Sequence, residues 1–166
     1  MNNNYNKMKK ETSWFKFSVG KNKAIVNISN IAKIEEYNPE KIKKTIGNKD
    51  FINGIIDSMG EPISVLDLKK YLNINETEEE KKQKKIILIL KKEDIITNKI
   101  EKIGIKTDEV IETINLSNEI KFYEQDTTVI FHKFFHEVAK IEEQFIYKLD
   151  VNELFKEIPV LGRNKK

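Results

Sequence analysis

The apolar residues of this chain come in short segments separated by turn-forming residues, and this spacing constrains the fold most strongly. Phe15, Phe17 and Val19 alternate with polar residues, as in a half-buried strand. About eight strand-like segments follow one another along the chain. Residues 86–90 lack the alternation, so we expect a strand that is buried on both faces. The pattern favours a mainly β protein, either a barrel or a sandwich, with a few helices.

Short helices are predicted where an aspartate precedes an apolar stretch. Asp67 is placed to cap a helix over 68–72, and Asp150 is placed to cap a helix at the C-terminal end, over 151–158. Residues 129–141 are ambiguous, because their apolar positions also fit a helical period.

Polar segments suggest where the folded domain begins and ends. Residues 1–12 are rich in Asn and Lys and read as a disordered tail, and residues 159–166 form a second polar tail. The intervening residues 13–158 are long enough for one compact domain. Within them, residues 75–85 carry no apolar side chain and read as an exposed linker.

Composition excludes several classes of protein. The 166 residues include no cysteine, which excludes disulfides and thiolate chemistry. Lys and Arg total 30 and Asp and Glu total 27, so the net charge is only +3. The longest apolar run, 86–90, is far shorter than the roughly 18 residues that a membrane span needs. No apolar stretch follows the basic N-terminus, so we expect no signal peptide and a cytoplasmic protein.

Catalytic and metal-binding motifs are weak. His132 and His136 have the spacing of one helical face, but Lys133 stands where zinc peptidases carry a glutamate. The six glycines are scattered and form no phosphate-binding loop, and no Gly-x-Ser-x-Gly motif is present. We therefore expect no enzyme, no metal and no cofactor.

Nucleic-acid binding is the main alternative function, since small β-barrels bind single strands and the chain is slightly basic. Against it, acidic residues are interleaved with the lysines and Arg163 is the only arginine. Two lysine clusters would carry such binding: Lys41, Lys43, Lys44 and Lys49, and Lys81, Lys82, Lys84, Lys85, Lys91 and Lys92.

One segment, residues 51–68, resembles the CheW-type chemotaxis coupling proteins. Phe51, Gly54, Gly60 and the pair Asp67-Leu68 match the family pattern in identity and spacing. Further segments that resemble the family in the same order are 15–20, 28–34, 103–110 and 149–155. The resemblance extends over residues 14–158.

The resemblance implies two SH3-like, five-stranded β-barrel lobes that share a core, meeting near the linker 75–85, with residues 134–149 forming a β-hairpin around Glu142-Glu143. It also implies a non-catalytic adaptor that couples chemoreceptors to a CheA-type histidine kinase. One surface would bind the regulatory domain of the kinase and another the cytoplasmic tip of the receptor, recruiting the protein to membrane receptor arrays. The partner-binding residues implied are Ile31, Lys33, Ile34, Gly54, Met59 and Gly60.

The chain departs from the family pattern at several positions. Met59 replaces an arginine, and Lys33 replaces an acidic residue. The usual proline ahead of Phe51 is missing, and Glu137 stands where the family has a late glycine. Because interface charges set partner choice more than affinity, we expect either a divergent adaptor whose partners carry compensating changes or an adaptor that belongs to a non-standard pathway. Apolar anchors such as Ile31, Ile34 and Met59 would then carry the contact.

Overall fold

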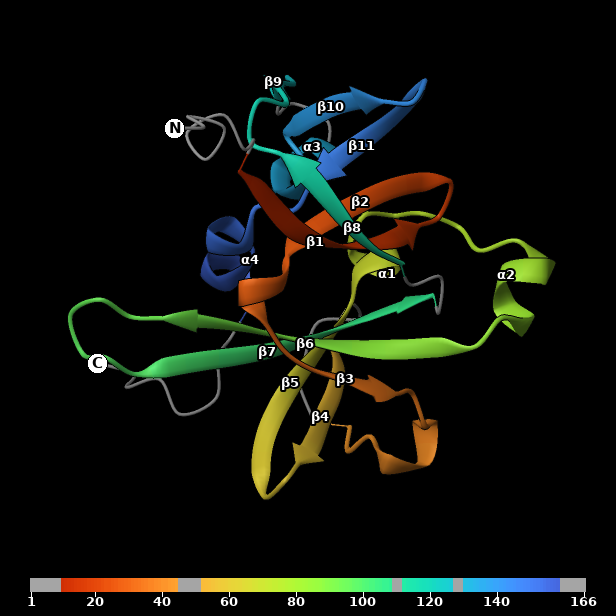
Figure 1. Cartoon of the computed structure of the whole chain (residues 1–166). Coiled ribbons are helices and arrows are strands. Elements are labelled where there is room, and N and C mark those ends of the chain that lie inside the picture. Colours follow the sequence, from red (N-terminus) through yellow and green to blue (C-terminus); the bar gives the residue numbers. More distant parts are fainter. Residues whose placement is uncertain (1–9, 45–51, 109–111, 127–129, 159–166) are drawn as a thin grey trace.

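Two curled β-sheets, joined by short helices, make up the structure (Figure 1). The computed structural model describes residues 10–44, 52–108, 112–126 and 130–158, with the backbone alone described at 52 and 53. The expectation of a mainly β protein is confirmed. Of the predicted tail 1–12, residues 11 and 12 belong to the first strand, while residues 1–9 and the tail 159–166 lie outside the described residues.

The six-stranded sheet combines the two ends of the chain, in the order β8-β1-β2-β11-β10-β9. Its neighbours pair antiparallel except β2 and β11, which are parallel. Its sixth member, β9, has two residues, which is one short strand more than the expected five. The strands are β1 Glu11–Val19, β2 Asn22–Asn27, β8 Glu112–Ser117, β9 Tyr123–Glu124, β10 Glu137–Ile141 and β11 Gln144–Lys148.

The five-stranded sheet is built from the middle of the chain, in the order β3-β6-β7-β5-β4. Here β5 and β7 are parallel and the other neighbours are antiparallel. The edge strands are therefore β3 and β4. The strands are β3 Ile31–Glu36, β4 Ile52–Ser58, β5 Glu61–Asp67, β6 Lys85–Glu93 and β7 Ile100–Asp108.

The largest core lies between the sheets, and each sheet has a smaller core on its other face. Strand β6 shows this division, since Leu88 belongs to the shared core whereas Ile87 and Ile89 belong to the separate core of the five-stranded sheet. All of residues 86–90 are buried, which confirms the prediction made from their lack of alternation. The six-stranded sheet has its own cluster around Trp14 and Ile25.

Two of the short helices begin at the predicted aspartates. Asp67 accepts a hydrogen bond from the Lys70 backbone N–H at 3.2 Å, and Asp150 accepts one from the Glu153 N–H at 3.0 Å. Each carboxylate thus satisfies an N–H that has no partner within the helix. The helices are α1 Leu68–Tyr71, α2 Glu78–Lys82, α3 Ile130–Phe134 and α4 Val151–Glu157, with 3₁₀ turns η2 Ile28–Asn30 and η3 Pro39–Lys41.

The ambiguous segment 129–141 divides between a helix and a strand. Helix α3 ends at Phe134, and β10 begins at Glu137, while residue 129 lies outside the described residues. Strands β10 and β11 form the hairpin implied by the family resemblance, with Glu142 and Glu143 both at positive φ, at 49° and 64°. Phe134 and Phe135 are buried in the shared core, and Val138 and Ala139 of β10 are buried as well, so the apolar positions recur at a spacing that also fits a helix.

Residues 75–85, which were expected to form a linker near the junction of the two lobes, contain a helix and lie within one lobe. The segment contains α2 and connects α1 to β6, so it lies within the lobe of the five-stranded sheet. The chain crosses from the six-stranded sheet to the five-stranded sheet at η2, and it returns to the six-stranded sheet between β7 and β8. No residue of α2 is buried, but an ion-pair network holds the segment in place. Lys69, whose side chain is 7% exposed, lies 2.6 Å from Asp108 and 3.2 Å from Glu80.

Candidate partner-binding surface

The turn between β4 and β5 presents a methionine to solvent. Ser58 pairs with Glu61, which leaves Met59 and Gly60 as a two-residue loop with φ of 53° and 83°. A loop with positive φ at both positions matches the twist of a hairpin but strains any residue with a Cβ, by about 1–2 kcal/mol. Met59 is nevertheless 89% exposed and makes no contribution to the core. A strained, solvent-exposed apolar residue favours a binding role over a structural one.

The edge strand β3 is joined to this turn through one carboxylate. Ser58 donates a hydrogen bond from its Oγ to Glu35 Oε1 at 2.8 Å, and Lys33 Nζ lies 2.9 Å from the same oxygen. Burial would raise the pKa of Glu35, but the hydrogen bonds from Lys33 and Ser58 outweigh it and hold that pKa below its usual range. Glu35 therefore stays charged and ties the turn to β3, across the open side of the sheet.

The bond between Ser58 and Glu35 thus brings Lys33 on β3 near the turn that carries Met59 and Gly60. By strand alternation, Ile34 lies on the opposite face of β3 from Lys33 and Glu35. Ile34 on β3 is 39% exposed, and Ile31 is partly buried against the shared core. Sequence reasoning missed Glu35 and Ser58, although strand alternation places Glu35 on the same face as Lys33. We call this patch the Met59 surface, and it consists of Lys33, Glu35, Ser58, Met59 and Gly60.

Gly54, the sixth predicted contact residue, has a different placement. It is buried at φ +145°, and a Cβ there would lie 2.5 Å from the carbonyl oxygen of Lys43. Lys43 pairs with Ile55 as an isolated bridge, so the chain segment before β4 covers this edge strand. Gly54 allows that close approach, and its role as a partner contact stays a prediction.

The two histidines do not share a helical face, contrary to the spacing argument. His132 lies in α3, whereas His136 lies beyond its end. Nδ1 of His132 contacts the backbone oxygen of Asp126 at 2.9 Å, and Nε2 of His136 contacts Asp150 Oδ2 at 2.7 Å. Within the described ranges, no three His, Asp or Glu residues are grouped so that they could hold a metal ion.

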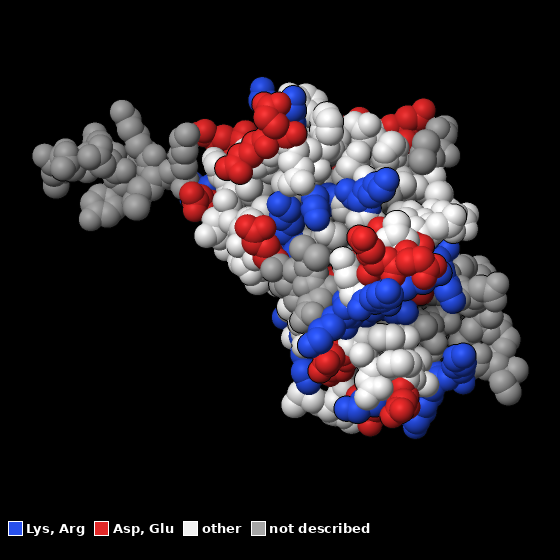
Figure 2. All heavy atoms as spheres, turned by 90° about the vertical axis from the view of Figure 1, so that its right-hand side faces the viewer, with Lys and Arg blue, Asp and Glu red and all other residues white. Residues whose placement is uncertain are grey.

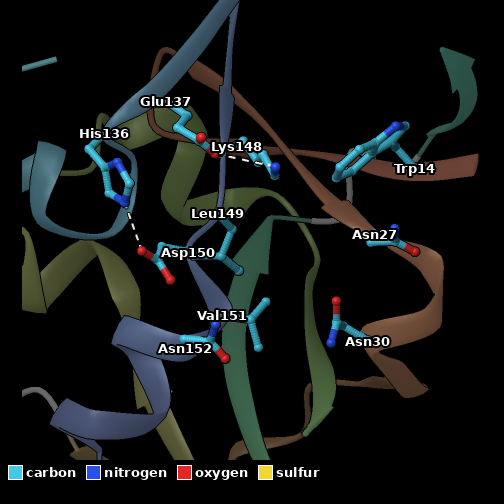
Figure 3. Close-up of a pocket in the computed structure, with 10 residues that line it drawn as sticks. All are labelled: Trp14, Asn27, Asn30, His136, Glu137, Lys148, Leu149, Asp150, Val151 and Asn152. Atoms are coloured by element: carbon cyan, nitrogen blue, oxygen red, sulfur yellow. Dashed lines mark hydrogen bonds and ion pairs between the residues drawn. The ribbon is translucent and has the colours of Figure 1, made fainter. Parts of the chain in front are cut away.

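A polar cleft of about 440 Å³ opens beside α4 and includes His136 (Figure 3). Its charged groups are already paired: His136 with Asp150, and Lys148 with Glu137 at 3.3 Å. The Lys148 ammonium also lies 5.6 Å from the ring centre of Trp14. Burial would raise the pKa of Asp150, but the hydrogen bonds from His136 and from the α4 backbone lower it more. These pairs stabilise the local structure.

The lysine clusters are less available to a polyanion than the sequence suggests. Lys85 is largely buried, where it pairs with Asp108 and lies 3.6 Å from Glu76. Figure 2 shows lysine side chains and patches of acidic side chains interleaved on the face that carries α2. Lys49 lies outside the described residues.

Comparison with known proteins settles the family. The model of the CheW-like domain matches residues 13–158, which is most of the chain. The chain belongs to the CheW-like domain family. Among curated proteins, none matches it. A crystal structure of the scaffolding protein TtCheW from Thermoanaerobacter tengcongensis is similar in fold, with a TM-score of 0.70, 23% identity, and coverage of 93% of this chain and 92% of that chain.

Membership of the CheW-like family confirms the resemblance read from residues 51–68 and the fold class implied by it. The structure shows where three of the residues that depart from the family pattern lie. Met59 stands at the tip of an exposed turn, Lys33 pairs with Glu35, and Glu137 pairs with Lys148 in the cleft. Phe51 and the missing proline before it lie outside the residues whose side chains are described. None of the helices described is long and apolar enough to cross a membrane.

Proposed function

We propose that this CheW-like protein is a non-catalytic adaptor that couples chemoreceptors to a CheA-type histidine kinase, and that it is cytoplasmic and recruited to receptor arrays. The family match over residues 13–158 supports the adaptor role. The observation that carries the proposal for the site is the Met59–Gly60 turn, which holds an 89% exposed methionine in a strained conformation.

The Met59 surface has the composition of a protein-binding site. An exposed apolar side chain, Met59, stands at a turn that Ser58 joins to the charged pair of Lys33 and Glu35. In such interfaces a few apolar anchors carry most of the binding free energy, and the surrounding charges select the partner. Because Ser58 ties the turn to β3 through Glu35, the anchor is held in position before binding. Little conformational entropy is then lost on association.

The proposed adaptor works through rigidity. Two sheets that share one buried core fix the positions of surfaces on either lobe relative to each other. A protein with two fixed binding surfaces can hold a receptor tip and a kinase domain together at high effective concentration. No reactive group is required for this coupling.

Titration with the regulatory domain of the kinase encoded in the same genome tests this proposal. We expect Met59→Ala to weaken binding about tenfold, as expected for an interface anchor. Ile96→Ala is the matched control, because Ile96 is 92% exposed on a different hairpin turn, between β6 and β7. Absence of binding at tens of micromolar protein, or equal losses in both variants, would refute the proposed site.

A further inference from the structure

A second surface, at the other end of β5 from the Met59 turn, has lysines around a hollow whose lining is partly apolar. The hollow has a volume of about 500 Å³ and lies between residues 37–44, α1 and the segment that contains α2. Its rim carries Lys44, Lys70 and Lys81. Asp67 at this site and the Met59 turn mark opposite ends of β5, which places the two surfaces roughly 20 Å apart.

The two carboxylates that line the hollow, Asp67 and Glu76, already have lysine partners. Asp67 accepts the Lys70 backbone N–H and lies 3.7 Å from Lys106 Nζ. Glu76 lies 3.6 Å from Lys85 and 3.9 Å from Lys69. Both carboxylates of the lining therefore have lysine partners other than Lys44 and Lys70.

Most of the positive charge of the rim lysines is not offset by carboxylates of the described residues. Within the described part of the chain, neither Lys44 nor Lys70 has a carboxylate within ion-pair distance. Lys81 pairs with Glu78 at 3.2 Å, but the Glu78 side chain is 84% exposed, and such surface pairs contribute little. The charge that faces the hollow is positive.

The walls between these lysines are apolar and supported from behind. Tyr37 and Ile42 pack against the core of the five-stranded sheet, and Ile74 packs against the shared core. All three are only partly buried, so each keeps a face toward the hollow. A ligand that fits both features carries an apolar side chain flanked by carboxylates.

We propose that this lysine-rimmed hollow binds an acidic segment of a partner protein. Its carboxylates pair with Lys44 and Lys70, while an apolar side chain of the segment lies against Ile42 and Ile74. Pairing of glutamates with lysines already occurs beside the hollow within the chain, where Glu76 and Glu80 pair with Lys69. This surface is separate from the Met59 surface, so the two can be tested independently.

A nucleic acid fits the hollow less well than an acidic peptide. The ring of Tyr37 has the Lys106 ammonium 4.3 Å from its centre, which leaves that face unavailable for base stacking. Two exposed acidic residues of α2, Glu78 and Glu79, precede Lys81 in the same helix and oppose a continuous phosphate backbone. A short peptide needs to place carboxylates only at Lys44 and Lys70.

Fluorescence polarisation of the full chain with a labelled peptide of alternating Glu and Leu tests the proposal. We expect saturable binding that weakens with added salt, and an affinity about fivefold lower in Lys44→Glu and in Lys70→Glu. Lys99→Glu, in the β6–β7 turn, is the charge-matched control and should bind like the unmodified chain. Lys44→Arg should also retain binding, and thermal unfolding confirms that each variant is folded.

The outcomes separate the alternatives. Loss of binding in the two rim variants, with retention in Lys99→Glu, supports the peptide site. Absence of peptide binding, or equal affinity in Lys44→Glu and the unmodified chain, overturns it. Tighter binding of single-stranded DNA than of the peptide, lost in the same rim variants, would also overturn it in favour of a nucleic-acid site. Kinase binding through Met59 is unaffected by any of these results.

Discussion

Replacing Asp108 with asparagine should strongly destabilise the fold, because one carboxylate holds two buried lysines. Asp108 is 2% exposed and pairs with Lys69 at 2.6 Å and with Lys85. The side chains of these lysines are only 7% and 10% exposed, so neither can regain full hydration when the carboxylate is lost. Removing one partner of a buried ion pair typically costs about 3–5 kcal/mol. Because Glu76 and Glu80 still pair with the lysines, we expect the lower end of this range, about 3 kcal/mol.

This cost is large beside the total stability of a domain, which is about 5–15 kcal/mol. For a chain of this size each kcal/mol corresponds to about 2–4 °C, so we expect the melting temperature to fall by roughly 6–12 °C. Urea and thermal unfolding followed by circular dichroism measure both quantities. Glu143→Gln is the control, because Glu143 pairs with Lys140 at the surface with its side chain 91% exposed, and should change stability by under about 0.5 kcal/mol.

Two further variants test whether the loss comes from unpaired charge. Lys69→Met leaves Asp108 paired with Lys85, so it should cost less than Asp108→Asn. The double variant Lys69→Met/Asp108→Leu should be less destabilised than the sum of its single variants, because it removes both charges. If Asp108→Asn matches the Glu143→Gln control, the ion-pair network does not hold the α2 segment and the reasoning is refuted.

Three other variants test the turn, the edge strand and a helix cap. Met59→Asn should raise stability by about 0.5–1 kcal/mol while weakening kinase binding, because asparagine tolerates positive φ; unchanged binding would contradict the role of the side chain. Gly54→Ala should lower the free energy of unfolding by several kcal/mol, because a Cβ at this position would lie 2.5 Å from the Lys43 oxygen. Urea unfolding measures this loss. The pKa of Asp150 is lowered in the folded state. The carboxylate therefore contributes fully to the free energy of unfolding above about pH 4, and this contribution is lost as the pH falls further. Asp150→Asn should therefore flatten the acid limb of stability measured by urea unfolding between neutral and acidic pH, and an unchanged slope would contradict this.

The parts of the fold that depend on local chemistry could be predicted from sequence. Asp67 and Asp150 were placed as helix caps because a cap needs only the residues that follow it. The burial of residues 86–90 followed from their lack of alternation. These signals lie within a few consecutive residues, so no knowledge of the rest of the chain was needed.

The parts that depend on distant partners could not be predicted. Residues 75–85 contain only polar side chains, and their attachment requires Lys69 and Asp108, which lie elsewhere in the sequence. The bond between Ser58 and Glu35 likewise joins the two edges of a sheet whose strand order the sequence does not reveal. In 129–141 the helix and the strand both bury apolar residues, so periodicity alone could not separate them.

Reconstitution of receptor control over kinase activity tests the central claim most directly. The measurement is autophosphorylation of the kinase from the same genome, with receptor signalling fragments, in the presence and absence of this protein. We predict that receptor state changes the kinase rate only when the protein is added, and that Met59→Ala weakens the effect while Ile96→Ala does not. Receptor control that is equally strong without the protein would contradict its role as the coupling adaptor.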